Sequence, residues 1–143
     1  MRTYTKALNI MIILLLFIAS GCQTVQKVDQ KTKFDAALRD YMQSLRWQDF
    51  YGAAAFMVEE NRAAFLEDVT GNEALNITDL TLLNLEPTNN PDEYQTLIRL
   101  EYFMLPSTTV KKKEIHQTWI LVLDPSSVKP KGWQIATPFP EFP

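Results

Sequence analysis

The stretch EYQTLIRLEYFMLPSTTVKKKEIHQTWILVL, residues 93–123, decides the fold class. Apolar and polar residues alternate on both sides of the turn at 106–109, and a period of two is typical of strands with one buried face. We therefore expect two long strands, 93–105 and 110–123, joined as a hairpin. Their apolar faces consist of Tyr94, Ile98, Leu100, Tyr102 and Met104 on the first strand and Ile115, Trp119, Leu121 and Leu123 on the second.

Two further strands are expected on either side of this hairpin. Residues 75–86 also alternate, and the turn residues at 87–92 separate them from the hairpin. A proline-containing loop at 124–131 precedes a short strand at 132–137. The alternation assigns to one side of the strand at 75–86 the residues Ile77, Thr81, Leu83 and Leu85.

The segment before these strands is predicted to be helical. In residues 33–46, apolar side chains recur at spacings of three and four, which places them on one helix face. A second helix is expected at 49–58, with Asp49 as its N-cap, and a third at 60–68. Helices followed by strands favour an α+β fold with an antiparallel sheet. The apolar face of the first helix consists of Phe34, Ala37, Leu38, Tyr41 and Leu45.

The first 21 residues have the layout of a secretory signal peptide. Arg2 and Lys6 precede an unbroken apolar run from 10 to 18, and small residues follow it up to Cys22. A membrane-spanning helix is the alternative, but it needs roughly 20 apolar residues, about twice the length of this run. We therefore expect export and cleavage.

The residues Ile18-Ala19-Ser20-Gly21-Cys22 resemble the bacterial lipobox, with Ala19 where leucine is usual. The resemblance implies cleavage between Gly21 and Cys22, a diacylglyceryl thioether on Cys22, and an acyl chain such as palmitate on the new amino terminus. Several acyl chains together hold a protein stably on a membrane. Gln23, in place of aspartate after the cysteine, implies the outer membrane of the bacterial cell envelope, facing the periplasm.

The domain organisation follows from this leader and from the length of 143 residues, which suits a single domain. Residues 1–21 are the predicted lipoprotein signal peptide, and 22–32 are the lipidated cysteine and a flexible polar tether. Residues 33–143 are the predicted single α+β domain. Cys22 is the one cysteine of the chain, so no intramolecular disulfide is expected.

The order of elements resembles the nuclear transport factor 2-like fold, also called cystatin-like. The resemblance rests on the helix at 33–46, the small-residue segment WQDFYGAAAFM at 47–57, and the hairpin at 93–123. It implies that the N-terminal helices pack on a curved antiparallel sheet and form an open cone. Members of that family include isomerases, dehydratases and binding or assembly domains, so the fold does not imply a function.

Four residues of the hairpin are candidate cavity or ligand contacts: Arg99, Glu101, Tyr102 and Trp119. Arg99 and Glu101 share one strand face, where they would form either a pair inside the cone or charges on a solvent-exposed face. The one histidine, His116, falls on the same side as Lys112 and Glu114, and we expect it to be exposed to solvent.

Composition limits the function further. The chain has 14 basic and 17 acidic residues, and without Arg2 and Lys6 of the leader its net charge is about −5, which argues against nucleic acid as a partner. No phosphate-binding loop, GxSxG motif or spaced Cys/His set is present, so we expect no cofactor, no metal and no catalytic residues. Three hypotheses remain open, the last of which is a structural lipoprotein with no discrete ligand.

The first hypothesis is a lipid-anchored envelope protein with a non-enzymatic binding or assembly domain. Its partners would be the membrane, through the lipid on Cys22, and an envelope protein or a small ligand. The alternative is an acid–base enzyme of the isomerase or dehydratase type that uses the cone cavity. The enzyme requires His116 and a carboxylate in the cavity, whereas binding requires an aromatic pocket without convergent acids.

The C-terminal residues TPFPEFP, 137–143, carry two phenylalanines between prolines. Such a segment suits an extended conformation that docks on a groove of a partner. The alternative is that it packs back on its own domain.

Overall fold

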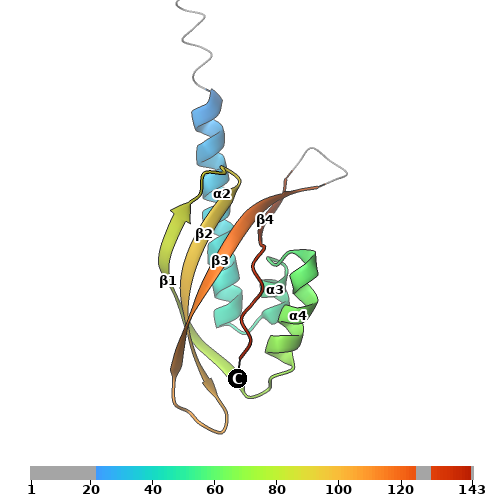
Figure 1. Ribbon diagram of the computed structural model, residues 1–143, viewed down its shortest axis with the longest axis vertical. Helices are drawn as coiled ribbons and strands as arrows, with labels where there is room; N and C mark the ends of the chain where they lie inside the picture. Colours follow the sequence, from blue (N-terminus) through green and yellow to red (C-terminus); the bar gives the residue numbers. More distant parts are fainter. Residues whose placement is uncertain (1–21, 125–129, 143) are drawn as a thin grey trace, which may run out of the picture. The chain divides into compact units, whose positions relative to one another are not determined.

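The computed structural model describes residues 22–124 and 130–142. Within these residues, three helices precede a four-stranded, curved antiparallel sheet, so the expected α+β class is confirmed (Figure 1). The signal peptide predicted for residues 1–21 lies outside the described residues. The elements are α2 (Cys22–Arg46), α3 (Phe50–Ala54), α4 (Glu59–Thr70), β1 (Leu75–Pro87), β2 (Glu93–Met104), β3 (Lys111–Leu123) and β4 (Pro130–Ile135).

The helix α2 begins at Cys22, which corrects the conformation predicted for the tether. Residues 23–32 were expected to be flexible, but they belong to a helix of 25 residues. No glycine or proline occurs between 22 and 46 to interrupt it, and an ion pair of 2.6 Å between Lys33 and Asp29 bridges one turn. Among the described residues, no helix combines the length and apolar character that crossing a membrane requires.

The chain divides into two compact units between Phe34 and Asp35. The second unit contains the rest of α2, the two shorter helices and the whole sheet. Four residues of the predicted apolar helix face, Phe34, Leu38, Tyr41 and Leu45, are buried. The 3.6-residue period therefore identified the buried face of α2.

The sheet has the order β1-β2-β3-β4, with each strand antiparallel to its neighbour. Pairing of Ile98 with Ile115 and of Tyr94 with Trp119 brings the predicted apolar faces of β2 and β3 onto one side of the sheet. We call this side the inner face, because the ring of Tyr41 from α2 packs edge-on against Trp119, with 5.6 Å between centroids. The opposite side is the outer face.

The side assignment within 75–86 is correct for Ile77 and Leu85 but wrong for Thr81, because β-bulges interrupt β1. The register with β2 shifts at Thr78 and again at Leu83, and an extra residue reverses the side on which the following side chains point. Thr81, assigned to the apolar side by alternation, instead lies opposite Arg99 on the outer face. The inner face of β1 carries Ile77, Leu80, Leu82 and Leu85.

The turn after α2 is fixed by two capping devices. Gln48 has a positive φ of 58°, and the N–H groups of Gln48 and Asp49 donate to the carbonyls of Leu45 and Ser44, which is the Schellman pattern. Asp49 then caps α3 as predicted, since its Oδ1 accepts from the N–H of Gly52 at 2.9 Å. A Cβ at position 52 would lie 2.2 Å from Asp49 Oδ2, so a larger residue there would displace the capping carboxylate.

A chain of polar side chains crosses the apolar core. Gln117 Nε2 donates to the Tyr41 hydroxyl at 2.9 Å, and Trp119 Nε1 donates to Thr96 Oγ1 at 3.2 Å. The Thr96 hydroxyl contacts Gln117 Oε1 at 3.5 Å, the long limit for a hydrogen bond. Burial raises the pKa of Tyr41, and the hydrogen bond from Gln117 offsets part of that effect.

The segment after β4 packs back on its own domain. The Phe139 ring lies edge-on to Phe65 of α4 at 4.9 Å, and the Phe142 ring lies edge-on to Tyr102 at 4.9 Å. Lys113 Nζ donates to the carbonyl of residue 141 and sits over the Phe142 ring. Of the two alternatives for these residues, the structure shows the second.

Candidate functional site

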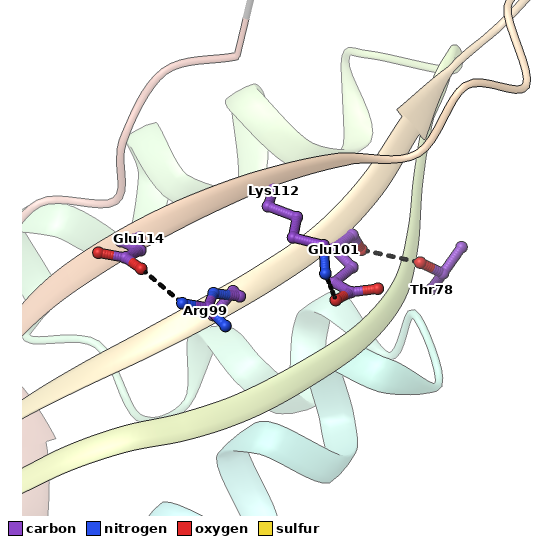
Figure 2. Close-up of polar contacts among 5 residues, drawn as sticks. All are labelled: Thr78, Arg99, Glu101, Lys112 and Glu114. Carbon is purple, nitrogen blue, oxygen red and sulfur yellow. Dashed lines mark hydrogen bonds and ion pairs between the residues drawn. The ribbon is translucent and has the colours of Figure 1, made fainter.

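Arg99 and Glu101 lie on the outer face, and each pairs with the neighbouring strand (Figure 2). Arg99 Nη2 is 2.9 Å from Glu114 Oε1, and Lys112 Nζ is 2.9 Å from Glu101 Oε1. The backbone carbonyl of Glu101 also accepts from the Thr78 hydroxyl at 3.1 Å. Partly exposed cross-strand pairs of this kind contribute little stability. Because both residues lie on the outer face, they are not a pair inside a cavity.

Tyr102 and Trp119 lie on the other side of the same strands. Both side chains are on the inner face, and they are 5 % and 0 % exposed. Successive residues of a strand point to opposite faces, so Glu101 and Tyr102 cannot line the same cavity. The four candidate residues are divided between the two faces of the sheet, in keeping with the strand alternation. A contact of any one of them with a ligand stays a prediction.

His116 is exposed on the outer face, opposite Leu97, as the strand alternation predicted. It borders a polar hollow of about 240 Å³. The other described residues that line this hollow, none of which carries a carboxylate, are Gln95, Thr96, Gln117, Thr118 and Thr137.

An open groove of about 450 Å³ lies between α2 and β1. We call it the α2–β1 groove. Its residues come from the C-terminal half of the helix and from the bulged part of the strand. The lining consists of Asp35, Leu38, Arg39, Met42, Gln43, Arg46 and Trp47 from the α2 side and Leu82 and Leu85 from β1.

The helix contributes a stripe of residues beside its buried face. Asp35, Arg39, Met42 and Arg46 follow one another at spacings of three and four, so they lie along one side of α2. Leu38 belongs to the neighbouring buried face and forms part of the floor of the groove. The helix therefore presents an apolar floor with a charged rim.

The strand contributes the opposite wall because of its second bulge. The extra residue at Leu83 returns Leu85 to the inner face on which Leu82 lies. Leu82 is nevertheless 37 % exposed, and Trp47 at the helix end is 72 % exposed. Large apolar side chains that share a concave surface and stay open to water mark binding surfaces more often than isolated exposed residues do.

Arg46 ties the helix to the strand. Its Nη2 atom donates to the carbonyl of Leu80 at 2.8 Å and lies 2.8 Å from Asp79 Oδ1. Both side chains of the ion pair are about half exposed, so water screens their attraction. The contact with Leu80 fixes the distance between the two walls of the groove.

Within residues 22–124 and 130–142, no cluster of three or more His, Cys, Asp or Glu side chains is placed to hold a metal ion. The described surface instead offers the α2–β1 groove, which is suited to apolar contact with a cationic edge.

Sequence reasoning missed the groove. Met42 and Leu82 belong to no recognisable sequence motif, and alternation placed Leu82 on the wrong side of β1. The one available signal was the surplus of leucines at 80, 82, 83 and 85, which exceeds what one face of an edge strand requires.

By sequence, the chain matches no family model and no curated protein. Among solved structures, a sec-c motif containing protein from Psychrobacter arcticus matches 78 % of this chain with a TM-score of 0.57 and 6 % identity. This chain spans 62 % of that protein's length. Rv0760c from Mycobacterium tuberculosis matches 72 % of this chain and 92 % of its own, with a TM-score of 0.42 and 13 % identity.

At 6 % identity the first likeness shows a shared fold alone, and the second is too loose to add to it. Membership of the nuclear transport factor 2-like family stays a prediction.

Proposed function

We propose that the chain is a lipid-anchored protein of the bacterial cell envelope whose α+β domain binds an apolar partner without catalysing a reaction. The lipid is carried by Cys22, and cleavage after Gly21 exposes that residue. The outer membrane, on its periplasmic side, is the proposed location. The α2–β1 groove is the observation that carries the binding function.

The composition of the groove supports binding over catalysis. Its residues are mainly apolar, with the exposed indole of Trp47 at one end and a single carboxylate, Asp35, among the described lining residues. An acid–base enzyme would place His116 in the cavity with a carboxylate. His116 lies on the outer face, whereas Leu82 and Leu85 of the groove lie on the inner face.

The anchor is tested by Cys22→Ser in the native host. The variant should accumulate as an unprocessed precursor that lacks the mass of the lipid, because serine has no thiol to form the thioether. A Ser20→Ala variant is the matched control and should mature normally. A Cys22→Ser protein with the mature lipidated mass would refute the anchor.

Binding at the groove is tested by replacing Leu82 with a photo-crosslinking amino acid in the intact envelope. A control position is Leu123, which is also exposed but is not part of the groove. We expect an adduct of one defined mass from position 82 that is absent from position 123. The adduct should disappear when Leu85→Asp, which places a charge in the groove, is added. Equal adducts at both positions, or none at position 82, would contradict a binding groove.

A further inference from the structure

The size and lining of the α2–β1 groove suit a single apolar chain. Four aliphatic or thioether side chains form its floor and strand wall: Leu38, Met42, Leu82 and Leu85. A volume of about 450 Å³ lies in the lower part of the range for small-ligand pockets. Burying apolar surface drives the entry of a hydrocarbon chain, in proportion to the area removed from water.

The charge of the rim selects an anionic end group. Three charged residues line the groove: Asp35, Arg39 and Arg46. Arg46 is paired with Asp79, and Asp35 has an interaction partner of its own. Arg39, in contrast, has no hydrogen bond or ion pair to another side chain in the described part of the chain. Its guanidinium group presents a fork of donors that matches the two oxygens of a carboxylate.

The strand wall is poorly suited to a peptide that would add as a further strand. β1 is the edge of the sheet, but its Leu80 carbonyl already accepts from Arg46, and the N–H of Leu85 donates to Asn84 Oδ1 at 2.9 Å. The bulge at Leu83 interrupts the regular spacing that strand addition requires. An occupant that needs no backbone pairing fits this edge better.

From these three observations we infer that the α2–β1 groove binds one fatty acid, with its acyl chain between Met42 and the leucines of β1 and its carboxylate at Arg39. This inference rests on the proposed binding function and names the class of ligand. The carboxylate forms a charge-assisted, bidentate contact with Arg39, and the hydrocarbon covers the exposed surface of Leu82 and Trp47.

The test uses the full, lipidated protein in vesicles of phosphatidylethanolamine and phosphatidylglycerol. The probe is a palmitate that carries a photoactivatable diazirine in its chain, used below saturation, and the labelled peptides are identified by mass spectrometry. We expect label on the peptides that contain Met42, Leu82 and Leu85. The methyl ester of the same probe lacks the charge and should label them about fivefold less, as expected for loss of one contact worth about 1 kcal/mol.

Two variants separate the charge from the apolar contact. Arg39→Gln keeps a good helix former at an exposed position and should lower labelling by the acid about fivefold without changing labelling by the ester. Leu85→Asp should abolish labelling by both. The matched control is Arg99→Gln, which removes an arginine from the outer face and should change neither.

Helix content and melting temperature are recorded for every variant, and Met42→Gln replaces Leu85→Asp if that protein unfolds. Label spread over the outer face, or label that is indifferent to the ester and to Arg39→Gln, would overturn the fatty acid as the occupant. If position 82 still gives a specific adduct in the envelope, the proposed binding function survives that result. If position 82 gives no specific adduct either, both the fatty acid inference and the proposed binding function fail.

Discussion

The buried hydrogen bond between Gln117 and Tyr41 is expected to behave as one unit when either side chain is changed. Tyr41 is fully buried and Gln117 is 4 % exposed, so neither can turn to water for a replacement partner. Tyr41→Phe removes the acceptor and leaves the Gln117 amide unsatisfied. Gln117→Met keeps the shape of the side chain and leaves the Tyr41 hydroxyl unsatisfied.

The magnitude follows from the cost of a buried polar group without a partner, about 1–3 kcal/mol. Each single variant should therefore lose about that much free energy of unfolding. In the double variant both polar groups are gone, and replacing both partners by apolar groups of similar shape is close to neutral. The double variant should consequently be more stable than the sum of the single losses predicts, with a coupling of about 1–2 kcal/mol.

The assay is urea unfolding followed by circular dichroism, on leaderless chains that carry serine at position 22. The free energies can be compared only if the unfolding free energy falls with urea concentration at the same slope in wild type, the two single variants and the double variant. A matched control cycle combines Tyr41→Phe with Thr81→Ala, an exposed change on the outer face, and should be additive within about 0.5 kcal/mol. A Tyr41 and Gln117 coupling below that value would refute the idea that this bond holds α2 to the sheet.

Three further outcomes are expected. Because burial raises the pKa of Tyr41, its contribution to stability is fully present below the unfolded tyrosine pKa of about 10 and is lost as pH rises above it. Above pH 10, the free energy of unfolding of wild type should therefore fall by up to about 1.4 kcal/mol more per pH unit than that of Tyr41→Phe, measured by urea unfolding. Gln48→Gly should raise the free energy of unfolding by about 1 kcal/mol, because glycine has no Cβ to strain the positive φ at this position, and an unchanged urea midpoint would count against the capping description. Leu38→Ala should lower the free energy of unfolding by about 2 kcal/mol, the low end for a buried leucine, because the open groove lets water reach the vacated space. A loss below about half a kcal/mol would show that this helix face is not part of the core.

The sequence by itself determined the order of elements and most of the faces. Strands β2 and β3 begin and end within one residue of the alternating stretches, because a period of two matches the pleat wherever the ladder is regular. The same parity placed His116 on the exposed face. Asp49 also capped the second helix as its side-chain chemistry predicted.

Alternation failed where the backbone leaves the regular ladder. The bulges at Thr78 and Leu83 depend on how β1 bends against β2, and no local residue pattern marks them. The extra residue at the first bulge reversed the face to which the side chains between the two bulges point, relative to the prediction. In residues 22–32, polar composition suggested a tether, but composition alone does not prevent a helix when glycine and proline are missing.

The candidate site was decided by tertiary structure. Met42 and Leu82 are 40 positions apart in the sequence, and they line one groove because the end of α2 and the bulged half of β1 are fixed together through Arg46. The polar core was decided in the same way. Parity placed Gln117 beside Trp119 on one strand face, but its partner Tyr41 comes from a helix 76 residues earlier. Local periodicity fixes the direction of a side chain, whereas the residue it meets depends on how separate elements pack.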